Sequence, residues 1–483
     1  MRWVAACVVV AAGHLAAGCS GGDGNASPAS PGGAGGGAGA GTAGAVQGGS
    51  GGGGGPGGGA SGTQSGAGGQ SGKSGAAGSA GGPAKVCTEV RTIVSHGYQL
   101  RHPAHRNPGI LEYVYYYQPP GGTYWGTWAG GQKQTEAGTD FDAGFAAAFH
   151  PSATVAVLGL PPAPPGSSSN QTLRFFDRAI VGAVREASLP WPPFGTPGGA
   201  EPIYVSWDGE HYQVMAPVAG KGVEVALYDA AGNLTDAPVL VLEEAGSVLL
   251  ESDIRTDPVS GDTWWTYPQG SVKSWVAGWD RQRNALTPNK KGVTIDGPLG
   301  SMGSVPGVGV GSDGALVVSG TLLYWSVAKL SRSGKVEWLR ELPTHDVLVN
   351  GMPGSRSFYW FAPFQRADGG WSVLASDVYH VFRYDFDDKG NVGPETQLLT
   401  HSRCPLDKYC KNVGGTAYYL SAFQGEGETW LGFKDDSLAQ PNDMIPLPNQ
   451  WYRMVKIEPG CQVASMWDLT NGGTASPPDP PVP

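Results

Sequence analysis

Short apolar runs that end in polar turns follow one another along most of this chain of 483 residues. One of these runs spans Val225–Asp229 and closes at Gly232. Its turn residue recurs at Gly182, Gly232, Asn284, Gly334, Gly390 and Gly460. Apolar and β-branched runs bounded by Gly, Asn or Asp are typical of strands joined by tight turns. Successive turns are 50, 52, 50, 56 and 70 positions apart, and self-similarity at this period indicates a stacked or radial repeat.

A second set of Gly and Asp turns falls between the first, and each leads into an aromatic or β-branched run. These turns lie at Trp207–Gly209, Ser260–Trp265, Asp313–Val318, Asp368–Trp371 and Gly414–Tyr419. Two hairpins per unit predict four strands per unit. Proline-rich segments at 161–165 and 190–193 are expected in loops, because proline cannot donate to a central ladder. Residues 141–149 have phenylalanines at helical spacing, but they run directly into the apolar segment 153–157, which favours a strand.

The segment Ala148–Pro151, followed by Val155–Val157 and Thr172–Asp177, resembles a blade of a WD-repeat or similar β-propeller. The resemblance implies an all-β fold, a β-propeller of six or seven four-stranded blades. Six blades follow from the repeated turns, and residues 88–138 supply a seventh through the aromatic run Tyr113–Tyr117. The resemblance concerns the architecture, because Trp-Asp pairs are irregularly spaced and the domain has no Gly-His dipeptide. The competing architecture is a β-sandwich array.

The first residues of the chain carry one positive charge, Arg2, and then an apolar run, Trp3–Ala17. A run of about 15 residues is too short to span a bilayer but fits the apolar core of an export signal. The run closes in Leu15–Cys19, whose Ala-Gly-Cys ending resembles the lipobox of bacterial lipoproteins. The resemblance implies that residues 1–18 are a lipoprotein signal peptide and that the Cys19 thiol receives lipid (diacylglyceryl, with palmitate). The alternative is an ordinary secretory signal that is cleaved nearby.

Glycine dominates the segment that follows the cysteine. Residues 20–85 contain 30 glycines among 66 positions, and Val46 is the single branched apolar side chain. Such a composition cannot bury enough apolar surface to offset its ordering entropy. The expected organisation is therefore a lipidated cysteine and disordered tether over 19–85, a propeller domain over 86–470, and a disordered tail over 471–483.

The charge of the domain limits its partners. The whole chain has a formal net charge of −10, and residues 1–85 contribute +2 through Arg2, Asp23, Lys73 and Lys85, which leaves −12 for the remainder. An acidic domain without basic clusters is not expected to bind nucleic acid or anionic lipid. Membrane contact should come from the acyl chains, since two chains suffice for stable anchoring. The predicted location is the cell envelope outside the cytoplasm, with the outer membrane or cell surface favoured.

Four cysteines remain in the domain, and they allow three pairings. Proximity favours Cys404 with Cys410, which leaves Cys87 to pair with Cys461. In a closed propeller the first and last segments meet, so the second bridge would stop the ring from opening. The alternative, a zinc site, lacks the usual paired Cys-x-x-Cys spacing.

Motifs for ions, nucleotides and nucleophiles are weak throughout the domain. Asp385–Gly390 and Asp140–Gly144 partly match calcium loops, His102–His105 a metal site and Gly309–Gly314 a dinucleotide site. Gly261–Trp264 partly resembles the Asp-box of sialidase-type propellers, but Val259 stands at the aspartate position. A turn or loop explains each of these partial matches better. The domain also lacks a nucleophile elbow, a Walker loop and a His-Glu-x-x-His motif. We therefore expect neither a metal nor a cofactor.

The expected function is a lipid-anchored, non-enzymatic module that binds or scaffolds a surface glycan, peptide or protein. Most of the 16 tryptophans should pack in the core, but exposed clusters at Tyr115–Trp128 or Phe358–Phe361 would form stacking platforms. The alternative is a propeller-type polysaccharide lyase or glycoside hydrolase. Its first suspects are His211, His345, Asp346 and His380. Gathered in one pocket, these side chains would favour an enzyme, and scattered ones would favour a binding module.

Overall fold

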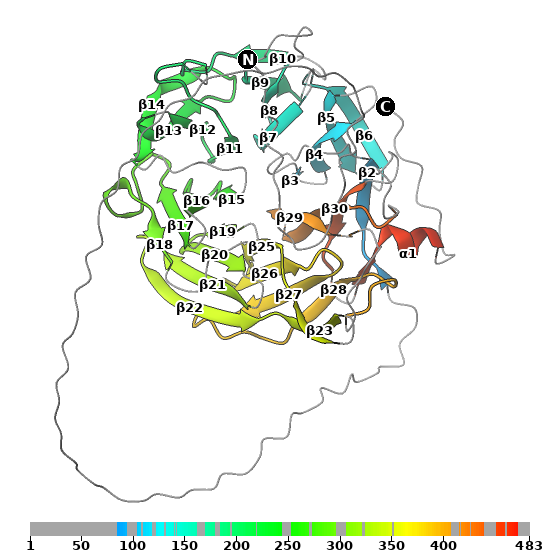
Figure 1. Ribbon diagram of the computed structural model, residues 1–483. Helices are drawn as coiled ribbons and strands as arrows, with labels where there is room; N and C mark the ends of the chain where they lie inside the picture. The colour runs from blue at the N-terminus through cyan, green and yellow to red at the C-terminus, as the bar shows by residue number, and fades with distance from the viewer. Residues whose placement is uncertain are drawn as a thin grey trace, which may run out of the picture. The chain divides into compact units, whose positions relative to one another are not determined.

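The described strands form eight sheets, of which seven are arranged in a ring (Figure 1). The computed structural model describes residues 85–93, 104–107, 110–117, 122–129, 132–139, 141, 143–161, 170–178, 184–193, 196–218, 220–243, 253–269, 273–295, 306–320, 324–349, 352–406, 415, 417–425, 427–438, 451–458 and 461–471. All of them belong to one compact unit. Within these ranges, no helix is long and apolar enough to cross a membrane.

Each sheet of the ring is one blade, and in blades 1 to 6 the four blade strands follow the chain from the centre of the ring outward. Blade 1 contains β3 (Ala104–Asn107), β4 (Ile110–Tyr117), β5 (Gly122–Ala129) and β6 (Gln132–Gly138). Blade 2 contains β7 (Ala143–Phe149), β8 (Thr154–Leu160), β9 (Thr172–Asp177) and β10 (Val184–Ala187). Blade 3 contains β11 (Tyr204–Trp207), β12 (Tyr212–Val218), β13 (Gly222–Tyr228) and β14 (Leu234–Leu242). Blades 4 and 5 contain β15 (Asp253–Thr256), β16 (Thr263–Gln269), β17 (Lys273–Trp279) and β18 (Val293–Thr294); and β19 (Gly307–Gly311), β20 (Gly314–Gly320), β21 (Tyr324–Ser331) and β22 (Val336–Pro343).

Blades 6 and 7 complete the ring. Their strands are β25 (Trp360–Gln365), β26 (Trp371–Ser376), β27 (Val381–Phe386) and β28 (Thr396–Thr400); and β29 (Tyr418–Gly425), β30 (Glu428–Asp435), β31 (Trp451–Lys456) and β2 (Glu89–Ile93). The remaining elements are β1 (Lys85–Val86), the hairpin β23 (His345–Val349) and β24 (Met352–Arg356), β32 (Cys461–Ala464), a 3-10 turn at Pro288–Lys290 and the helix α1 (Met466–Asn471). β1 and β32 extend blade 6 to six strands. The ring confirms the predicted β-propeller, and the β-sandwich alternative is wrong.

Middle strands are buried on both faces because each blade packs between two neighbours. Every residue of β13 and of β20 is buried, whereas most residues of the outer strands β14 and β22 are exposed or half-buried. The largest fully buried side chains include seven tryptophans, Trp125, Trp264, Trp265, Trp279, Trp325, Trp371 and Trp430. Aromatic rings supply the largest apolar area per residue, so the expected role of most tryptophans as core residues is confirmed.

The repeated turn phrase marks the third strand of a blade. Its six copies fall on β9, β13, β17, β21, β27 and β31 or on the turn that follows. In the turn after β13, the backbone N–H and side-chain amide of Asn233 both donate to the Asp229 carboxylate, at 2.7 and 2.8 Å. Gly232 has φ +81°, and a Cβ there would lie 2.5 Å from the Phe175 ring of the preceding blade. Gly390 in the turn after β27 likewise has φ +76°, and a Cβ there would lie 2.6 Å from the Trp338 ring, so at these two copies the turn needs a left-handed residue and close approach to a neighbouring ring.

One turn assignment was wrong in detail. The Gly414–Tyr419 segment was predicted as a turn within a blade, but it leads into β29, the first strand of blade 7. Tyr113–Tyr117 lies on β4, the second strand of blade 1, so the seventh blade predicted within residues 88–138 is confirmed. The segment 143–149 is the strand β7, and residues 190–193 lie in a loop, as predicted.

Arginines join neighbouring blades at the edge that carries the first-to-second and third-to-fourth turns, which we call the turn edge. Arg332 of blade 5 donates to both carboxylate oxygens of Asp262 in blade 4, at 2.6 and 2.8 Å. Arg281 of blade 4 donates to the Asp208 carbonyl of blade 3 at 2.7 Å. Such fork-shaped contacts fix orientation as well as distance. They hold the blades in register at this edge.

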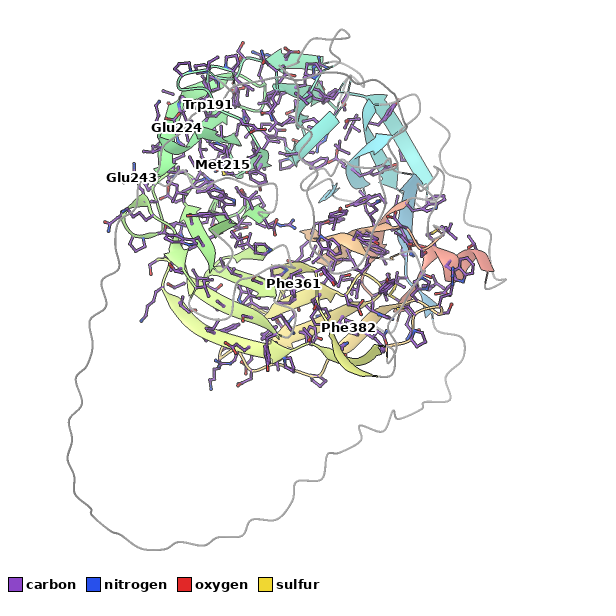
Figure 2. All side chains as sticks on the ribbon, viewed as in Figure 1. Trp191, Met215, Glu224, Glu243, Phe361 and Phe382 are labelled. Carbon is purple, nitrogen blue, oxygen red and sulfur yellow. A yellow bond between two sulfur atoms is a disulfide. The ribbon has the colours of Figure 1, made fainter. Side chains whose placement is uncertain are left out.

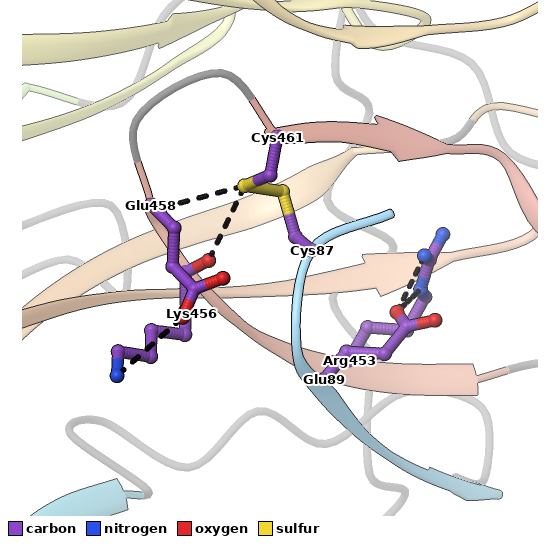
Figure 3. The surroundings of a disulfide bond; sticks show 6 residues. All are labelled: Cys87, Glu89, Arg453, Lys456, Glu458 and Cys461. Carbon is purple, nitrogen blue, oxygen red and sulfur yellow. Dashed lines mark hydrogen bonds and ion pairs between the residues drawn. A yellow bond between two sulfur atoms is a disulfide. The ribbon is translucent and has the colours of Figure 1, made fainter. Parts of the chain in front are cut away.

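The ring closes by pairing the beginning of the described chain with its end. β2 is the outer strand of blade 7 and pairs antiparallel with β31, while β1 pairs parallel with β32, which pairs in turn with β28. A disulfide joins Cys87 to Cys461 across 374 positions (Figure 3), which confirms the predicted bridge. Cys404 is also disulfide-bonded. Its predicted partner, Cys410, lies outside the described residues, so that pairing stays a prediction.

A buried arginine strengthens the same closure. Arg453 is 1% exposed and donates to Glu89 of β2 at 2.6 and 2.9 Å, to Asp435 at 2.8 Å and to the Ala464 carbonyl at 2.7 Å. Figure 3 shows the pair that Arg453 forms with Glu89. The backbone N–H of Met466 donates to the same Asp435 carboxylate. One side chain thus ties β2, β30 and β32 together.

Candidate ligand-binding surface

First strands begin, second strands end and third strands begin at one edge of every blade, which we call the entry edge. Four aromatic side chains meet at this edge between blades 6 and 7, and we call them the aromatic cluster: Tyr359, Trp360, Tyr418 and Tyr419. They meet because β25 and β29, whose first residues are Trp360 and Tyr418, lie side by side as innermost strands. Phe361, labelled in Figure 2, is buried behind the cluster and stacks on Trp325 at 5.7 Å.

The rings of the cluster brace one another. The Trp360 centroid lies 5.2 Å from Tyr418 and 5.2 Å from Tyr419, with interplanar angles of 69° and 64°. Tyr359 and Trp360 are 5.9 Å apart. Edge-to-face geometry at these distances is favourable and leaves little rotational freedom. Tyr419 is 39% exposed and the other three rings are half-buried, so the cluster presents a rigid aromatic surface to solvent.

The backbone at Tyr419 is distorted in a way that directs the side chain. Pairing of β29 with β30 shifts between Tyr418 and Ser421, so one extra residue stands on β29. Tyr419 has φ +62°, the left-handed region that non-glycine residues rarely adopt. A bulge of this kind turns a side chain away from the regular alternation. The chain thereby places two consecutive tyrosines, Tyr418 and Tyr419, in the same cluster.

A second strained residue lies beside the first. Val378 has φ +82°, which is a true outlier for a β-branched side chain. Its carbonyl accepts the Ala417 N–H at 2.8 Å, and the Ser376 hydroxyl donates to the Ala417 carbonyl at 2.6 Å. These bonds join the β26–β27 connection of blade 6 to the residue that precedes β29. Strain of about 1–3 kcal/mol persists only where the surroundings over-determine the conformation, and such positions gather at functional sites.

A buried aspartate organises the strained connection. One Asp377 carboxylate oxygen accepts the backbone N–H groups of Tyr379 and His380, at 2.9 and 2.7 Å. The other oxygen lies 3.0 Å from Nδ1 of His380, whose Nε2 lies 2.7 Å from the Cys404 carbonyl. Both ring nitrogens of His380 are therefore engaged in holding the loop. This predicted catalytic suspect supports the aromatic cluster and has no nitrogen directed at a substrate.

Charged groups beside the cluster neutralise each other. Lys434 lies 5.8 Å above the Tyr418 ring and pairs with Asp436 at 2.9 Å, with side-chain exposures of 15% and 6%. Burial raises the pKa of Tyr418 well above its usual range, so its phenol stays neutral at any physiological pH. The surface thus combines aromatic faces, one neutral hydroxyl and one compensated ion pair.

Of the other catalytic suspects, His345 lies near His380, since both contact one phenylalanine ring, and His211 lies apart from them. His211 lies in the β11–β12 turn at the turn edge, where its N–H donates to Asp208 at 2.6 Å. His345 begins β23. Its ring centroid lies 4.4 Å from that of Phe382, and the His380 ring lies 6.0 Å from the same Phe382 ring. Figure 2 labels Phe382 within blade 6. The Asp346 side chain lies outside the described residues.

His345 belongs to a small polar cluster that the sequence did not predict. The Glu395 carboxylate lies 2.7 Å from Nε2 of His345 and accepts the Tyr384 hydroxyl at 2.5 Å. Burial would raise the pKa of Glu395, but these two partners outweigh it and leave the pKa lowered. Burial and the neighbouring carboxylate raise the pKa of Tyr384. The carboxylate oxygen is fully used in joining β23 to blade 6.

A cavity of about 440 Å³ lies at the outer end of blade 6. Its lining residues are His380, Gln397, His401, Ser402, Cys404, Pro405, Leu406, Ala464 and Asp468. The Asp468 carboxylate in it accepts the hydroxyls of Ser402 and Ser465. Among the described residues, no group of three or more His, Cys, Asp or Glu side chains is placed to hold a metal ion.

Several predicted motifs are structural turns. The Asp387 carboxylate accepts the N–H groups of Lys389 and Asn391, so the Asp385–Gly390 segment is the β27–β28 turn. Gly309–Gly314 forms the β19–β20 hairpin, and Gly261–Trp264 leads from a turn into β16. Asp140, Asp142, His102, Cys19, the tether before residue 85 and the tail after residue 471 lie outside the described residues, as do the side chains of His105 and Tyr115–Tyr117.

Of the two aromatic platforms predicted, Phe358–Phe361 contributes to the cluster through Tyr359 and Trp360. Phe358 and Phe361 themselves are core residues, at 1% and 4% exposure. Tyr418 and Tyr419 were not predicted to join a platform, because the segment Gly414–Tyr419 was interpreted as a turn that leads into a strand. Their approach depends on a bulge and on the order of blades, and neither leaves a mark in local sequence.

No family model matches the chain, and no curated protein matches it. Among solved structures the chain is similar to the Dos1 propeller, with TM-score 0.40 and 13% identity over 72% of this chain and 74% of that chain. It is also similar to a chain of the nidogen/laminin complex (TM-score 0.33, 11% identity, 59% of this chain and 93% of that chain). A luciferin-regenerating enzyme matches with TM-score 0.32 and 11% identity over 67% of this chain and 96% of its own. Similarity at this level assigns neither a family nor a function.

Proposed function

We propose that the protein is a binding module whose propeller is held outside the cytoplasm by lipid on Cys19 and takes its ligand at the aromatic cluster. The observation that carries the binding site is the pair of strained residues, Val378 and Tyr419, on adjoining connections of blades 6 and 7. Burial and hydrogen bonds hold these residues in costly conformations, and the result is an exposed, rigid aromatic surface. Rigid aromatic side chains give large contact area at low entropic cost, which suits recognition.

Anchoring outside the cytoplasm is supported by two features. The Ala-Gly-Cys ending of the apolar N-terminal run is the pattern that precedes a lipidated cysteine. The Cys87–Cys461 disulfide fits a protein that folds in an oxidising compartment. Anchoring on two acyl chains would leave the acidic domain free of direct contact with the bilayer.

A binding role fits the placement of the catalytic suspects better than a lyase or hydrolase does. His211 is at the turn edge, whereas His345 and His380 are near the entry edge and each is engaged by a carboxylate. General acid–base catalysis needs a titratable group within reach of the substrate proton. A screen of polysaccharides for turnover by the full-length protein tests the alternative. Cleavage that is abolished by His345→Ala would contradict a purely binding role.

Lipid attachment is tested by metabolic labelling of the full-length chain. Wild type and Cys19→Ser are expressed in a bacterium fed an alkyne analogue of palmitate. We expect label on the wild type and none on the variant. Equal labelling of both proteins, or none in the wild type, would contradict the anchor.

The binding site is tested by screening the detergent-purified full-length protein against glycans, peptides and envelope proteins. We expect binding that Tyr419→Asn weakens and Tyr324→Ala leaves unchanged. Asparagine tolerates the left-handed conformation, so Tyr419→Asn removes the ring and keeps the backbone. Tyr324 is the matched control, because it is 48% exposed and begins β21 at the same edge but outside the cluster. Binding equally sensitive to both variants would contradict the assignment.

A further inference from the structure

We infer that the aromatic cluster binds a neutral saccharide, with sugar rings stacked on Tyr419 and Trp360. This inference rests on the proposed function and names the class of its ligand. Each aromatic face carries negative charge from the ring quadrupole. The C–H bonds on one face of a sugar ring are polarised by neighbouring oxygens, so they are attracted to such a face.

The arrangement of the rings suits flat, rigid ligands. Trp360 contacts both tyrosines nearly edge-on, at 69° and 64°, so the rings meet at steep angles instead of forming one parallel stack. Tyr419 is the most exposed of them, at 39%. Because the bulge and the neighbouring rings already fix these side chains, little conformational entropy is lost when a ligand binds.

Polar groups beside the rings match sugar hydroxyls. The Lys434 ammonium has three donors and the Asp436 carboxylate has acceptor sites, and the two groups pair at 2.9 Å. Adjacent hydroxyls of a sugar both donate and accept, so they can bridge such a pair without leaving a charge uncompensated. A few placed polar groups within an apolar lining are what small-ligand sites use to fix orientation.

Charge favours a neutral ligand over an anionic one. Lys434, which lies 5.8 Å above the Tyr418 ring, is compensated by Asp436. Residues 86–483 carry a formal charge of −12, since the whole chain has −10 and residues 1–85 have +2. A polyanionic glycan would therefore meet an unfavourable field at this domain.

A peptide added as a strand is disfavoured at this position. The N–H and the carbonyl of Ala417, directly before β29, are already bonded to Val378 and Ser376. Strand addition obtains its affinity from unpaired backbone groups of this kind. The cluster offers ring faces and side-chain polar groups, which suit a saccharide.

The test measures binding of defined oligosaccharides to the full-length protein in detergent micelles by calorimetry. The neutral probes are cellohexaose, maltohexaose, laminarihexaose and chitohexaose, the anionic probe is hexagalacturonate, and a phage-displayed peptide library is screened in parallel. We expect saturable binding of at least one neutral probe. Its Kd should be the same within twofold at 50 and 500 mM NaCl, because no net charge is neutralised on binding.

Substitutions locate the site. We expect Tyr419→Asn and Trp360→Ala each to weaken binding of that probe about tenfold or more, since each removes a stacking ring. Tyr324→Ala should change it less than twofold. Tryptophan fluorescence should shift on binding in the wild type and lose that shift in Trp360→Phe, which keeps a ring at the position.

The outcomes separate this inference from the proposed function. Failure of all four neutral probes, or preference for hexagalacturonate with a strong salt dependence, overturns the inference. If peptides bind the wild type but not Tyr419→Asn, the saccharide ligand is overturned and the proposed binding site is supported. If no probe in any arm shows binding that depends on Tyr419, both the saccharide inference and the proposed binding site are overturned.

Discussion

Removal of the bridge between Cys87 and Cys461 should loosen the ring at blade 7 before any other blade. The proposed change is the double variant Cys87→Ala/Cys461→Ala, in which no free thiol remains at either position. The bridge joins positions 374 apart, and without it strand pairing, the Arg453 network and the packing of Val90 keep β2 in blade 7. The expected result is a less stable protein in which β2 and β32 open locally.

The magnitude follows from the length of the loop that the bridge closes. In the chain-entropy model, a separation of 374 positions corresponds to about 6 kcal/mol of stabilisation at 25 °C. Measured effects of removing native bridges are usually about 2–5 kcal/mol, because the reduced unfolded chain retains structure and relaxes. We therefore expect the free energy of unfolding to fall by about 2–6 kcal/mol.

Two measurements check this expectation. Urea unfolding followed by tryptophan fluorescence gives the free energy of unfolding, and hydrogen exchange of the native state gives local opening. The matched control is Val463→Ala in β32, which removes two methyl groups at a site 4% exposed and leaves the bridge intact. A double variant within 1 kcal/mol of wild type, with unchanged exchange in β2 relative to β13, would refute the reasoning.

Three further predictions concern charge and backbone strain. Arg453→Ala should lower the free energy of unfolding by about 3–5 kcal/mol in urea titrations, since Glu89 and Asp435 would remain buried without their partner; a loss below 1 kcal/mol would argue against a tight network. At Val378, whose φ is +82°, the glycine variant should be more stable than the alanine variant by about 1 kcal/mol in thermal melts, the reverse of the usual order. The lowered pKa of Glu395 contributes stability that is complete above its unfolded value of 4.5 and is lost as the pH falls through the folded value. Acid titration of Glu395→Gln should therefore show a shallower loss below pH 4.5 than wild type, and identical acid limbs would count against this contribution.

Local patterns in the sequence were sufficient to predict the propeller because each blade repeats the same physical requirement. The third strand must be buried on both faces and then turn sharply beside the neighbouring blade. In the turn after β27, the Asn391 N–H and side-chain amide both donate to Asp387 at 2.8 Å, as Asn233 does to Asp229 in blade 3. Asn284 donates to Asp280 in the same way in blade 4, and chemistry that recurs in these three turns produces a period that can be read without a structure.

The Cys87–Cys461 bridge could be predicted for a different reason. The proximity of Cys404 and Cys410 left Cys87 for Cys461, and closure of a ring brings its ends together whatever the details of the blades. The role of Arg453 could not be predicted, because its partners Glu89 and Asp435 are 364 and 18 positions away and share no motif with it.

The aromatic cluster was only half predictable because it lies at a position where the blades differ. The first residues of consecutive innermost strands are Tyr204, Asp253, Gly307, Trp360 and Tyr418 in blades 3 to 7. Tyr204 is 2% exposed, and a Cβ at Gly307 would lie 2.7 Å from a backbone oxygen of blade 6, so these two positions serve packing between blades. Trp360 and Tyr418 occupy the same place in the repeat but remain half-buried, next to the bulge on β29. A repeat imposes one backbone position on every blade and leaves its side chain free to vary, and the binding surface that we propose uses that variation.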